Sequence, residues 1–199
     1  MKTTVMFNAA LDELLERIRP VLALISNGRR GAGAGVLAGD GLVLTNLHVV
    51  GRARSVKVLL DDGSSYDAPV IAKDPQVDLA LLQIQPNGHP AATFSSSMPR
   101  PGELVYAFGH PWGQRNVLTG GVLSAVTSLR GRHGQIPVLR SDVQLAPGNS
   151  GGPLLNAGGE VIGLNAMIFG GDQSVAIPAS LIRSFLAGAR NDRPGEDVF

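Results

Sequence analysis

The strongest candidate for a nucleophile in this sequence is a serine in a glycine-dense segment. Ser150 lies within Pro147–Pro153, which reads PGNSGGP and precedes an apolar run. Glycines on both sides permit positive φ angles and leave room for a substrate against the backbone. In such a turn the N–H groups of Gly148 and Ser150 can converge on one point, which is the geometry of an oxyanion hole. An ordinary turn with an exposed serine is the alternative interpretation.

A serine hydroxyl is a weak nucleophile until a base removes its proton, and the sequence offers four histidines. His48 follows the apolar run Leu42–Leu47 and precedes two valines, so the orientation of its ring is restricted. His89 lies in a Gly-Pro turn and His133 in an Arg/Gly loop, which favours two solvated surface groups, and the loop residue His110 is ambiguous. We therefore expect His48 to be the base, with a structural histidine as the alternative.

A histidine base needs a carboxylate that holds its ring and stabilises the imidazolium. Asp78 precedes the apolar run Leu79–Leu82, where a carboxylate is costly to bury without a partner. Asp142 lies eight residues before Ser150, at the end of an expected strand. Asp142 is either a second carboxylate near the site or a residue that shapes the loop, so both aspartates remain candidates at this point.

Composition excludes several classes of function. The chain has 199 residues, of which 44% are hydrophobic and 17% charged, with a formal net charge of +1 and no cysteine. Without cysteine there is no disulfide, thiol nucleophile or Cys-ligated metal, and the balanced charge argues against nucleic acid as a partner. No apolar run approaches the roughly 18–20 residues of a membrane span. Because the histidines are scattered and Gly31–Gly35 precedes a hairpin rather than a helix, we expect neither a metal nor a cofactor.

The elements that must position these residues are mostly short strands, because 26 glycines and 13 prolines divide the chain. Apolar runs predict about six strands within residues 21–95 and about six within residues 102–178, joined by a linker. A loop is expected over Ser128–Gln135. Amphipathic spacing predicts one helix over residues 1–20 and another within residues 179–199, followed by a polar tail. The predicted fold class is all-β, with two small β-barrels side by side, and a single large sandwich is the alternative.

Three segments resemble, in the same order, the catalytic motifs of the HtrA (Deg) family of trypsin-like serine proteases. They are TNLHVV at 45–50, DLALL at 78–82 and GNSGGPLLN at 148–156. Connecting segments are similar as well: AFGHPWG at 107–113, LTGGVLS at 118–124 and EVIGLN at 160–165. The resemblance extends over residues 11–186 and implies one protease domain with the double β-barrel of the chymotrypsin and trypsin type. The first barrel would carry His48 and Asp78 and the second Ser150, with the active site in the cleft between them.

Carried over by position, the resemblance implies Ser150 as the nucleophile, His48 as the general acid and base, and Asp78 as the carboxylate that orients His48. The N–H groups of Gly148 and Ser150 would form the oxyanion hole. The implied activity is an ATP-independent serine endopeptidase that hydrolyses unfolded or misfolded proteins through an acyl-enzyme, in protein quality control. A non-hydrolysing peptide-binding or chaperone module on the same scaffold is the alternative. An esterase with the chain order Ser, acid, His is excluded because no histidine follows Ser150.

The resemblance also predicts the substrate pocket and the mode of activation. Gln144 stands where trypsin has a carboxylate at the base of its pocket. The other residues expected to line a neutral, apolar pocket are Leu145, Ala146, Ala166, Met167 and Ile168. Such a pocket predicts loosely selective cleavage after small or medium aliphatic residues. Asn149 stands where proteases activated by cleavage have an aspartate for the new N-terminus, so we expect no zymogen cleavage.

Family members usually carry a PDZ domain after the protease and form trimers through an N-terminal aromatic segment. This chain ends at Phe199 and offers only Phe7 as an early aromatic residue. We expect a protease domain without a PDZ domain, a homotrimer, and unfolded polypeptides as substrates. Asp12 and Glu13 interrupt any apolar signal segment, so a cytoplasmic location is expected. A periplasmic or secreted location is the alternative if an export signal lies outside this sequence.

Overall fold

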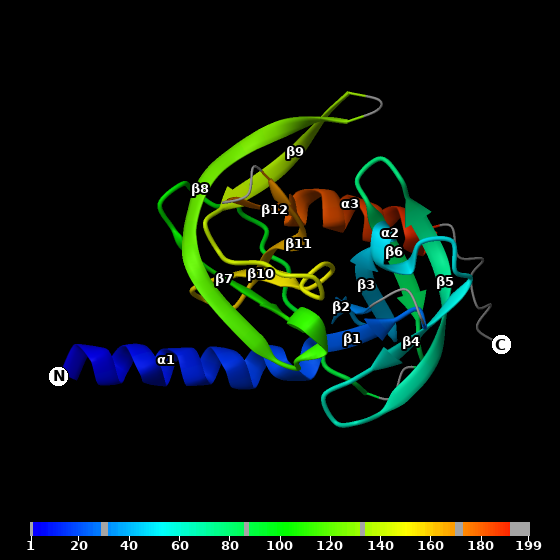
Figure 1. Cartoon of the computed structure of the whole chain (residues 1–199), viewed down its shortest axis with the longest axis horizontal. Helices are drawn as coiled ribbons and strands as arrows, with labels where there is room; N and C mark the ends of the chain where they lie inside the picture. The colour runs from blue at the N-terminus through cyan, green and yellow to red at the C-terminus, as the bar shows by residue number, and fades with distance from the viewer. Residues whose placement is uncertain (1, 29–31, 86–87, 132–133, 170–172, 192–199) are drawn as a thin grey trace.

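The structure is a computed structural model. It describes residues 2–28, 32–85, 88–131, 134–169 and 173–191, with side chains over these ranges except at 2–7 and 167–169. The described residues form two closed antiparallel barrels of six strands each (Figure 1). The predicted all-β double barrel is therefore confirmed, and the alternative of a single large sandwich is wrong.

The first barrel has the strand order β1–β2–β3–β6–β5–β4. Its strands are β1 (Leu22–Ser26), β2 (Ala32–Leu37), β3 (Leu42–Asn46), β4 (Ser55–Leu59), β5 (Ser65–Asp74) and β6 (Leu79–Gln83). Strand β3 pairs with β6, and Asn46 at the end of β3 lies opposite Leu79 at the start of β6. The residues that follow β3 and those that precede β6 are therefore neighbours at one end of the barrel.

The second barrel has the strand order β10–β11–β12–β9–β8–β7. Its strands are β7 (Leu104–Gly109), β8 (Val117–Gly131), β9 (Gly134–Ser141), β10 (Pro153–Asn156), β11 (Val161–Phe169) and β12 (Gln173–Pro178). The predicted loop over Ser128–Gln135 is wrong where the structure describes it, because residues 128–131 belong to β8 and residues 134–135 to β9, which pair as a two-stranded ribbon. Residues 132–133 lie outside the described residues. In this ribbon Leu129 lies opposite Ile136, so an apolar cross-strand pair stabilises a segment whose remaining residues are mostly polar.

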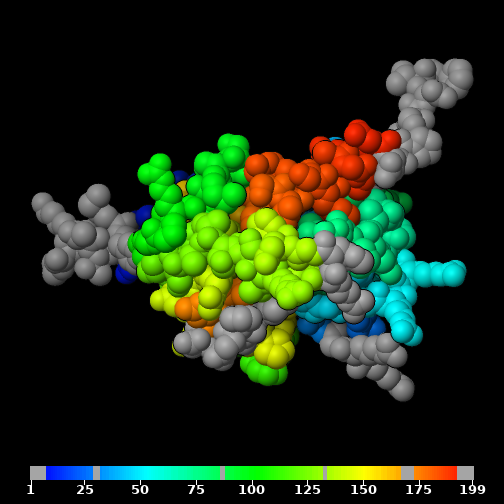
Figure 2. Space-filling view, turned by 90° about the horizontal axis from the view of Figure 1, so that it is seen from above, coloured from blue at the N-terminus to red at the C-terminus, as the bar shows by residue number. Residues whose placement is uncertain are grey.

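Among the described residues, a longer helix lies at each end of the chain and short helical segments lie between them. They are α1 (Lys2–Ile18), the short η1 (Arg19–Val21), α2 (Leu47–Val50), the short η2 (Pro111–Gly113) and α3 (Ala179–Asn191). Helix α1 extends away from the body in Figure 1 and buries Leu14 and Ile18 near its end. Helix α3 lies along the surface (Figure 2), and its Arg190 reaches Asp40 of the first barrel, with 3.4 Å between Nη2 and Oδ2. Within the described ranges, no helix combines the length and the apolar character needed to cross a membrane.

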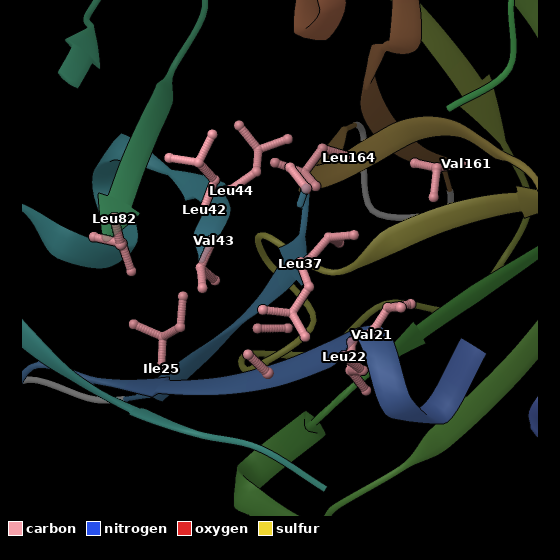
Figure 3. Packing of buried hydrophobic residues seen from close by; sticks show 14 of the residues in the cluster. Val21, Leu22, Ile25, Leu37, Leu42, Val43, Leu44, Leu82, Val161 and Leu164 are labelled. Atoms are coloured by element: carbon pink, nitrogen blue, oxygen red, sulfur yellow. The ribbon is translucent and has the colours of Figure 1, made fainter. Parts of the chain in front are cut away.

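One apolar core joins the two barrels. Leu37, Leu42 and Leu44 of the first barrel share a buried cluster with Val161 and Leu164 of β11 (Figure 3). Apolar area removed from water stabilises a fold by roughly 25 cal/mol per Å², so this shared cluster resists separation of the barrels. Side chains contributed by different barrels can therefore hold fixed relative positions.

Candidate active site

The contact between His48 and Asp78 follows from the pairing of β3 with β6. His48 lies in α2, directly after β3, and Asp78 directly precedes β6. The backbone carbonyl of Asp78 accepts hydrogen bonds from Leu47 N, at 3.0 Å, and from Asn46 Nδ2, at 3.1 Å. Asp78 adopts a φ of +56°, a left-handed conformation that aspartate tolerates better than most residues. The sheet register and this local conformation together turn the carboxylate towards His48.

Asp78 binds both the ring and the backbone of His48. Its Oδ2 lies 2.6 Å from His48 Nδ1, and its Oδ1 accepts a hydrogen bond of 2.9 Å from His48 N. Because an ionised carboxylate only accepts hydrogen bonds, the contact places a hydrogen on Nδ1. Nε2 is then left with a lone pair that can take a proton. The pair has the geometry of a general base with its orienting carboxylate.

The turn that carries Ser150 is attached to both barrels. Gly151 N donates to Asn165 O at 2.9 Å, and Asn165 N donates to Gly152 O at 2.8 Å, which ties the turn to β11. Ala34 N of β2 donates to Ser150 O at 2.8 Å, which ties the same turn to the first barrel. Ser150 thus lies at the boundary between the barrels, as a nucleophile shared by the two would.

The Ser150 turn and the His48 helix meet at Gly33. A Cβ atom added to Gly33 would lie 2.7 Å from the Val49 side chain and 3.0 Å from Ser150 O. The residue after His48 and the backbone of Ser150 are therefore in contact with the same backbone position. The helix that carries His48 and the turn that carries Ser150 therefore lie next to one another at the boundary between the barrels.

The hydroxyl of Ser150 is bonded away from His48. Ser150 Oγ donates a hydrogen bond of 3.0 Å to Ala166 O. Ala166 lies at an irregularity between β11 and β12, where the register shifts between Asn165 and Met167, so its carbonyl can face the turn. Within the described residues no hydrogen bond joins Ser150 Oγ to His48.

Two backbone donors flank Asn149. Asn149 N donates to Ala146 O at 3.0 Å, whereas the described residues provide no acceptor for the N–H groups of Gly148 and Ser150. Gly148 has a φ of +110°, and a Cβ atom there would overlap His110 O. Only glycine fits this position without moving its neighbour. Two unpaired N–H groups in a tight turn are the donors that an oxyanion hole requires.

The predicted pocket residues are described only in part. Gln144 is exposed, and its backbone oxygen accepts a hydrogen bond of 2.9 Å from Thr119 Oγ1. Leu145 and Ala146 are half-buried, and Ala166 is buried. The remaining two are Met167 and Ile168, whose side chains lie outside the described ones. The described pocket residues are thus uncharged, and none is an acid.

The second candidate carboxylate supports the loop rather than the histidine. Asp142 Oδ1 accepts a hydrogen bond of 2.6 Å from Val122 N, which holds β8 against the segment leading to Ser150. Of the two interpretations of Asp142, this contact matches that of a residue that shapes the loop. The shortness of this bond is typical of a charged acceptor.

Sequence reasoning missed the importance of His110. His110 is only 1% exposed, and its backbone N donates a hydrogen bond of 3.3 Å to Gly148 O. Burial lowers the pKa of His110 from 6.5 to about 4, and the charge of Arg115 acts in the same direction. The ring is therefore neutral at pH 7. A loop position before a proline gave no sign that both barrels would cover this ring.

Comparison with known proteins identifies the class of this fold and site. The family described as "Trypsin-like peptidase domain" matches residues 33–164. Because this match covers more than half of the chain, the protein belongs to the trypsin-like peptidase family.

Individual relatives narrow this class. The chain is similar to the serine protease HTRA1 of Xenopus tropicalis, with 41% identity over 200 residues, covering 91% of this chain and 43% of that protein. It is 37% identical to a probable periplasmic serine endoprotease, DegP-like, of Halomonas elongata, covering 84% of this chain and 37% of that one. The solved serine endoprotease of Yersinia pestis superposes with a TM-score of 0.81 at 30% identity, covering 91% of this chain and 66% of that chain. The predicted resemblance to HtrA proteases is confirmed, and the chain spans less than half the length of the first two relatives.

Proposed function

We propose that this protein is a serine endopeptidase with Ser150 as the nucleophile, His48 as the general acid and base, and Asp78 as the residue that orients His48. The observation that carries the proposal is the double contact of Asp78 with His48, at 2.6 Å to the ring and 2.9 Å to the backbone, beside the Ser150 turn. Similarity to HtrA and DegP-like serine proteases supports the same chemistry.

In the proposed reaction, the Ser150 hydroxyl leaves Ala166 O and turns towards His48 Nε2. Nε2 takes the proton as Oγ bonds to the carbonyl carbon of the substrate, and the N–H groups of Gly148 and Ser150 stabilise the resulting oxyanion. The imidazolium then gives its proton to the leaving amine as the C–N bond breaks, which leaves an acyl-enzyme. His48 next takes a proton from a water molecule as the water oxygen attacks the acyl carbon. The imidazolium then returns a proton to Ser150 Oγ as the ester C–O bond breaks, which releases the carboxylic acid and restores Ser150.

Unfolded polypeptides are the proposed substrates, in a quality-control role. The uncharged Gln144 and the apolar Ala166 support a pocket for aliphatic side chains, which unfolded chains expose and folded ones bury. A panel of peptides with Val, Leu, Phe, Arg or Asp before the cleaved bond tests this specificity. Val and Leu should give the highest kcat/KM, by about tenfold over Asp, and a highest value with Arg would contradict the pocket assignment.

Activation without cleavage is part of the same proposal. Asn149 is 4% exposed and carries no charge, so a new N-terminal ammonium would find no carboxylate to pair with at this position. Protein that has not been cut to free a new N-terminus for this position should therefore be active, which intact-mass measurement on the active protein checks. Activity that appears only after N-terminal cleavage would contradict this.

Location and assembly are proposed from the relatives and the sequence. The name of the DegP-like relative places that protein in the periplasm, which supports the periplasmic alternative over the cytoplasmic one for this protein. Cell fractionation with an antibody to the native protein tests the location. The proposed homotrimer is tested by the mass in solution, and a monomer at micromolar concentration would contradict it.

The second candidate function is a peptide-binding module that does not hydrolyse its ligand. The bond from Ser150 Oγ to Ala166 O favours it, because a hydroxyl fixed there is not activated. Degradation of unfolded casein and labelling by a fluorophosphonate separate the two functions, with Ser150→Ala as the inactive variant and Ser184→Ala on α3 as the matched control. The endopeptidase predicts cleavage and an adduct in the wild type and in Ser184→Ala only. Casein binding without either reaction would favour the binding module.

A further inference from the structure

We propose that Asp61, in the turn between β4 and β5 of the first barrel, positions the oxyanion-hole turn of the second barrel. It acts through the loop 110–116, which joins β7 to β8. The inference rests on the proposed function, because it assigns Gly148 and Ser150 to oxyanion binding. Asp61 touches neither the substrate nor the reacting atoms, so it is a positioning residue.

Asp61 and its neighbour Leu60 hold two residues of this loop. Asn116 Nδ2 donates a hydrogen bond of 2.7 Å to Asp61 Oδ1, and Arg115 Nη2 lies 3.7 Å from the same oxygen. Arg115 Nη2 also donates a hydrogen bond of 2.7 Å to Leu60 O. The partners are 55 residues apart in sequence and belong to different barrels. Three contacts therefore tie the end of the loop to the first barrel.

The loop passes this restraint to the oxyanion-hole turn. Asn116 N donates to His110 Nδ1 at 3.3 Å, and His110 N donates to Gly148 O at 3.3 Å. Trp112 N donates a hydrogen bond of 2.7 Å to Pro147 O. The backbone carbonyl of His110 also occupies the space that a Cβ atom on Gly148 would need. Movement of the loop is thus transmitted to Pro147 and Gly148 by bonds and by direct contact.

The backbone of this loop has a positive φ at two places, one of which is strained. Trp112 has a φ of +54° and Asn116 a φ of +59°. Positive φ is tolerated by asparagine but is a genuine outlier for a bulky residue such as tryptophan. Such conformations persist only where surrounding contacts over-determine them, and they cluster at functional sites. The bonds from Asp61 to Asn116 and Arg115 supply that restraint at the end of the loop.

The protonation state of His110 is consistent with these contacts, which lead from Asp61 through the loop 110–116 to Gly148. The neutral ring accepts the hydrogen bond from Asn116 N at Nδ1, which a doubly protonated ring could not do. Burial and the charge of Arg115 keep the pKa of His110 low, while Asp61 acts in the opposite direction. Arg115 therefore both pairs with Asp61 and favours the neutral ring on which these contacts depend.

The adjacent aspartate provides a matched control. Asp62 Oδ1 accepts a hydrogen bond of 2.8 Å from Ser64 N within its own turn, and the described contacts give it no partner in the second barrel. Asp61→Ala removes the contact across the barrels, Asp61→Asn keeps an oxygen that can accept from Asn116, and Asp62→Ala removes a carboxylate from the same turn. The three variants separate positioning from a general effect on the turn.

The test measures kcat and KM on a peptide substrate together with the rate of fluorophosphonate labelling. Asp61→Ala should lower kcat and the labelling rate by about tenfold, less than the loss of a whole oxyanion-hole donor, with KM within about twofold. Asp61→Asn should recover most of this loss, and Asp62→Ala should match the wild type. Equal kcat values for Asp61→Ala and Asp62→Ala in an active enzyme would overturn the proposal.

The loop also carries its own probe, because Trp112 is the single tryptophan of the sequence and its residue is 78% exposed. Asp61→Ala should lower the fluorescence anisotropy of Trp112, while circular dichroism and Tm confirm that the variant is folded. An unchanged anisotropy would overturn the proposal even if kcat fell. A wild type that neither cleaves nor reacts would instead refute the proposed function, and the anisotropy would still decide whether Asp61 restrains the loop.

Discussion

The two halves of the proposed active site are held by different kinds of structure. In the first barrel, His48 and Asp78 are fixed by the pairing of two central strands and by two direct hydrogen bonds. In the second barrel, Ser150 lies in a turn held by individual hydrogen bonds to β11, to β2 and to the loop 110–116, and its hydroxyl is bonded to Ala166 O. The proposed acid–base pair is preformed, whereas the hydroxyl of the proposed nucleophile must still leave Ala166 O.

The first barrel therefore holds its part of the proposed site rigidly, whereas the second barrel holds its part in a turn that can move. A sheet register cannot shift gradually, because a slip by one residue reverses every side chain. A turn held by a few hydrogen bonds can move by small amounts at low energetic cost. Changes in activity that leave the fold intact should therefore originate in the second barrel and the loop 110–116.

The largest expected effect breaks the preformed pair. Asp78→Asn should lower kcat by roughly 10⁴-fold, because an amide can hold the wrong imidazole tautomer. Asparagine tolerates the positive φ of this position, so Tm should change little. Steady-state kinetics with a peptide substrate measures the loss. A kcat within tenfold of the wild type would show that the pair is not the base of the reaction.

The next effect displaces the oxyanion-hole turn. Gly148→Ala introduces a Cβ atom that overlaps His110 O, and it should lower kcat by roughly 10²–10³-fold, the loss typical of one missing oxyanion donor. Gly63→Ala is the control, because Gly63 also has positive φ but no atom within 4 Å of an added Cβ. Both variants carry backbone strain, so only Gly148→Ala should lose activity beyond the change in Tm. A similar kcat for the two would contradict the role of this turn.

A smaller effect is the loss of stability at low pH that the buried His110 of the loop 110–116 should cause. The pKa of His110 is lowered to about 4 by burial, so between pH 6.5 and about 4 the unfolded chain binds more protons than the folded one. The free energy of unfolding should therefore decrease as the pH falls through this range, by up to about 1.4 kcal/mol per pH unit.

Denaturant titrations at several pH values compare the wild type with His110→Asn. Asparagine can accept the hydrogen bond from Asn116 N but does not titrate, so the variant should show a flatter pH dependence. An identical slope for the two proteins between pH 6.5 and 5 would refute the assignment of this slope to His110.

The smallest effect concerns a hydrogen bond between β2 and β3 of the first barrel, beside the Ser150 turn. Thr45 is buried, and its Oγ1 donates a hydrogen bond of 2.8 Å to Ala34 O beside the Ser150 turn. Thr45→Val should lower the free energy of unfolding by about 1 kcal/mol, as expected for one lost hydrogen bond. Urea denaturation measures the change, with Thr127→Val in β8 as the control. A loss no larger than that of the control would mean that this contact contributes little.

The sequence predicted the parts of the site that depend on neighbouring strands. Asn46 and Leu79 flank His48 and Asp78 in short apolar runs, and such runs pair in register. The same reasoning predicted two barrels, because turn residues divide the chain at regular intervals. It failed at residues 128–131 and 134–135, where polar residues on the faces of an exposed ribbon obscured the alternation.

The contacts across the barrels could not be predicted from the sequence. Asp61 and Asn116 both lie in turns, where such residues are common for local reasons, and nothing in their spacing indicates that they meet. The burial of His110 likewise depends on how the two barrels pack rather than on its neighbours in the chain. Residues that join one barrel to the other therefore leave no periodic pattern in the sequence.

The carbonyl of Ala166 has a consequence for inhibitor design. A reagent that carries only an electrophile can react only after the Ser150 hydroxyl has broken its hydrogen bond to Ala166 O without help from the reagent. A peptide-like reagent whose amide N–H donates to the same oxygen would replace the hydroxyl as donor. Binding of such a reagent would therefore free Ser150 Oγ to react with it. Peptidyl boronates and chloromethyl ketones should accordingly inactivate the protein faster than a simple sulfonyl fluoride of equal intrinsic reactivity.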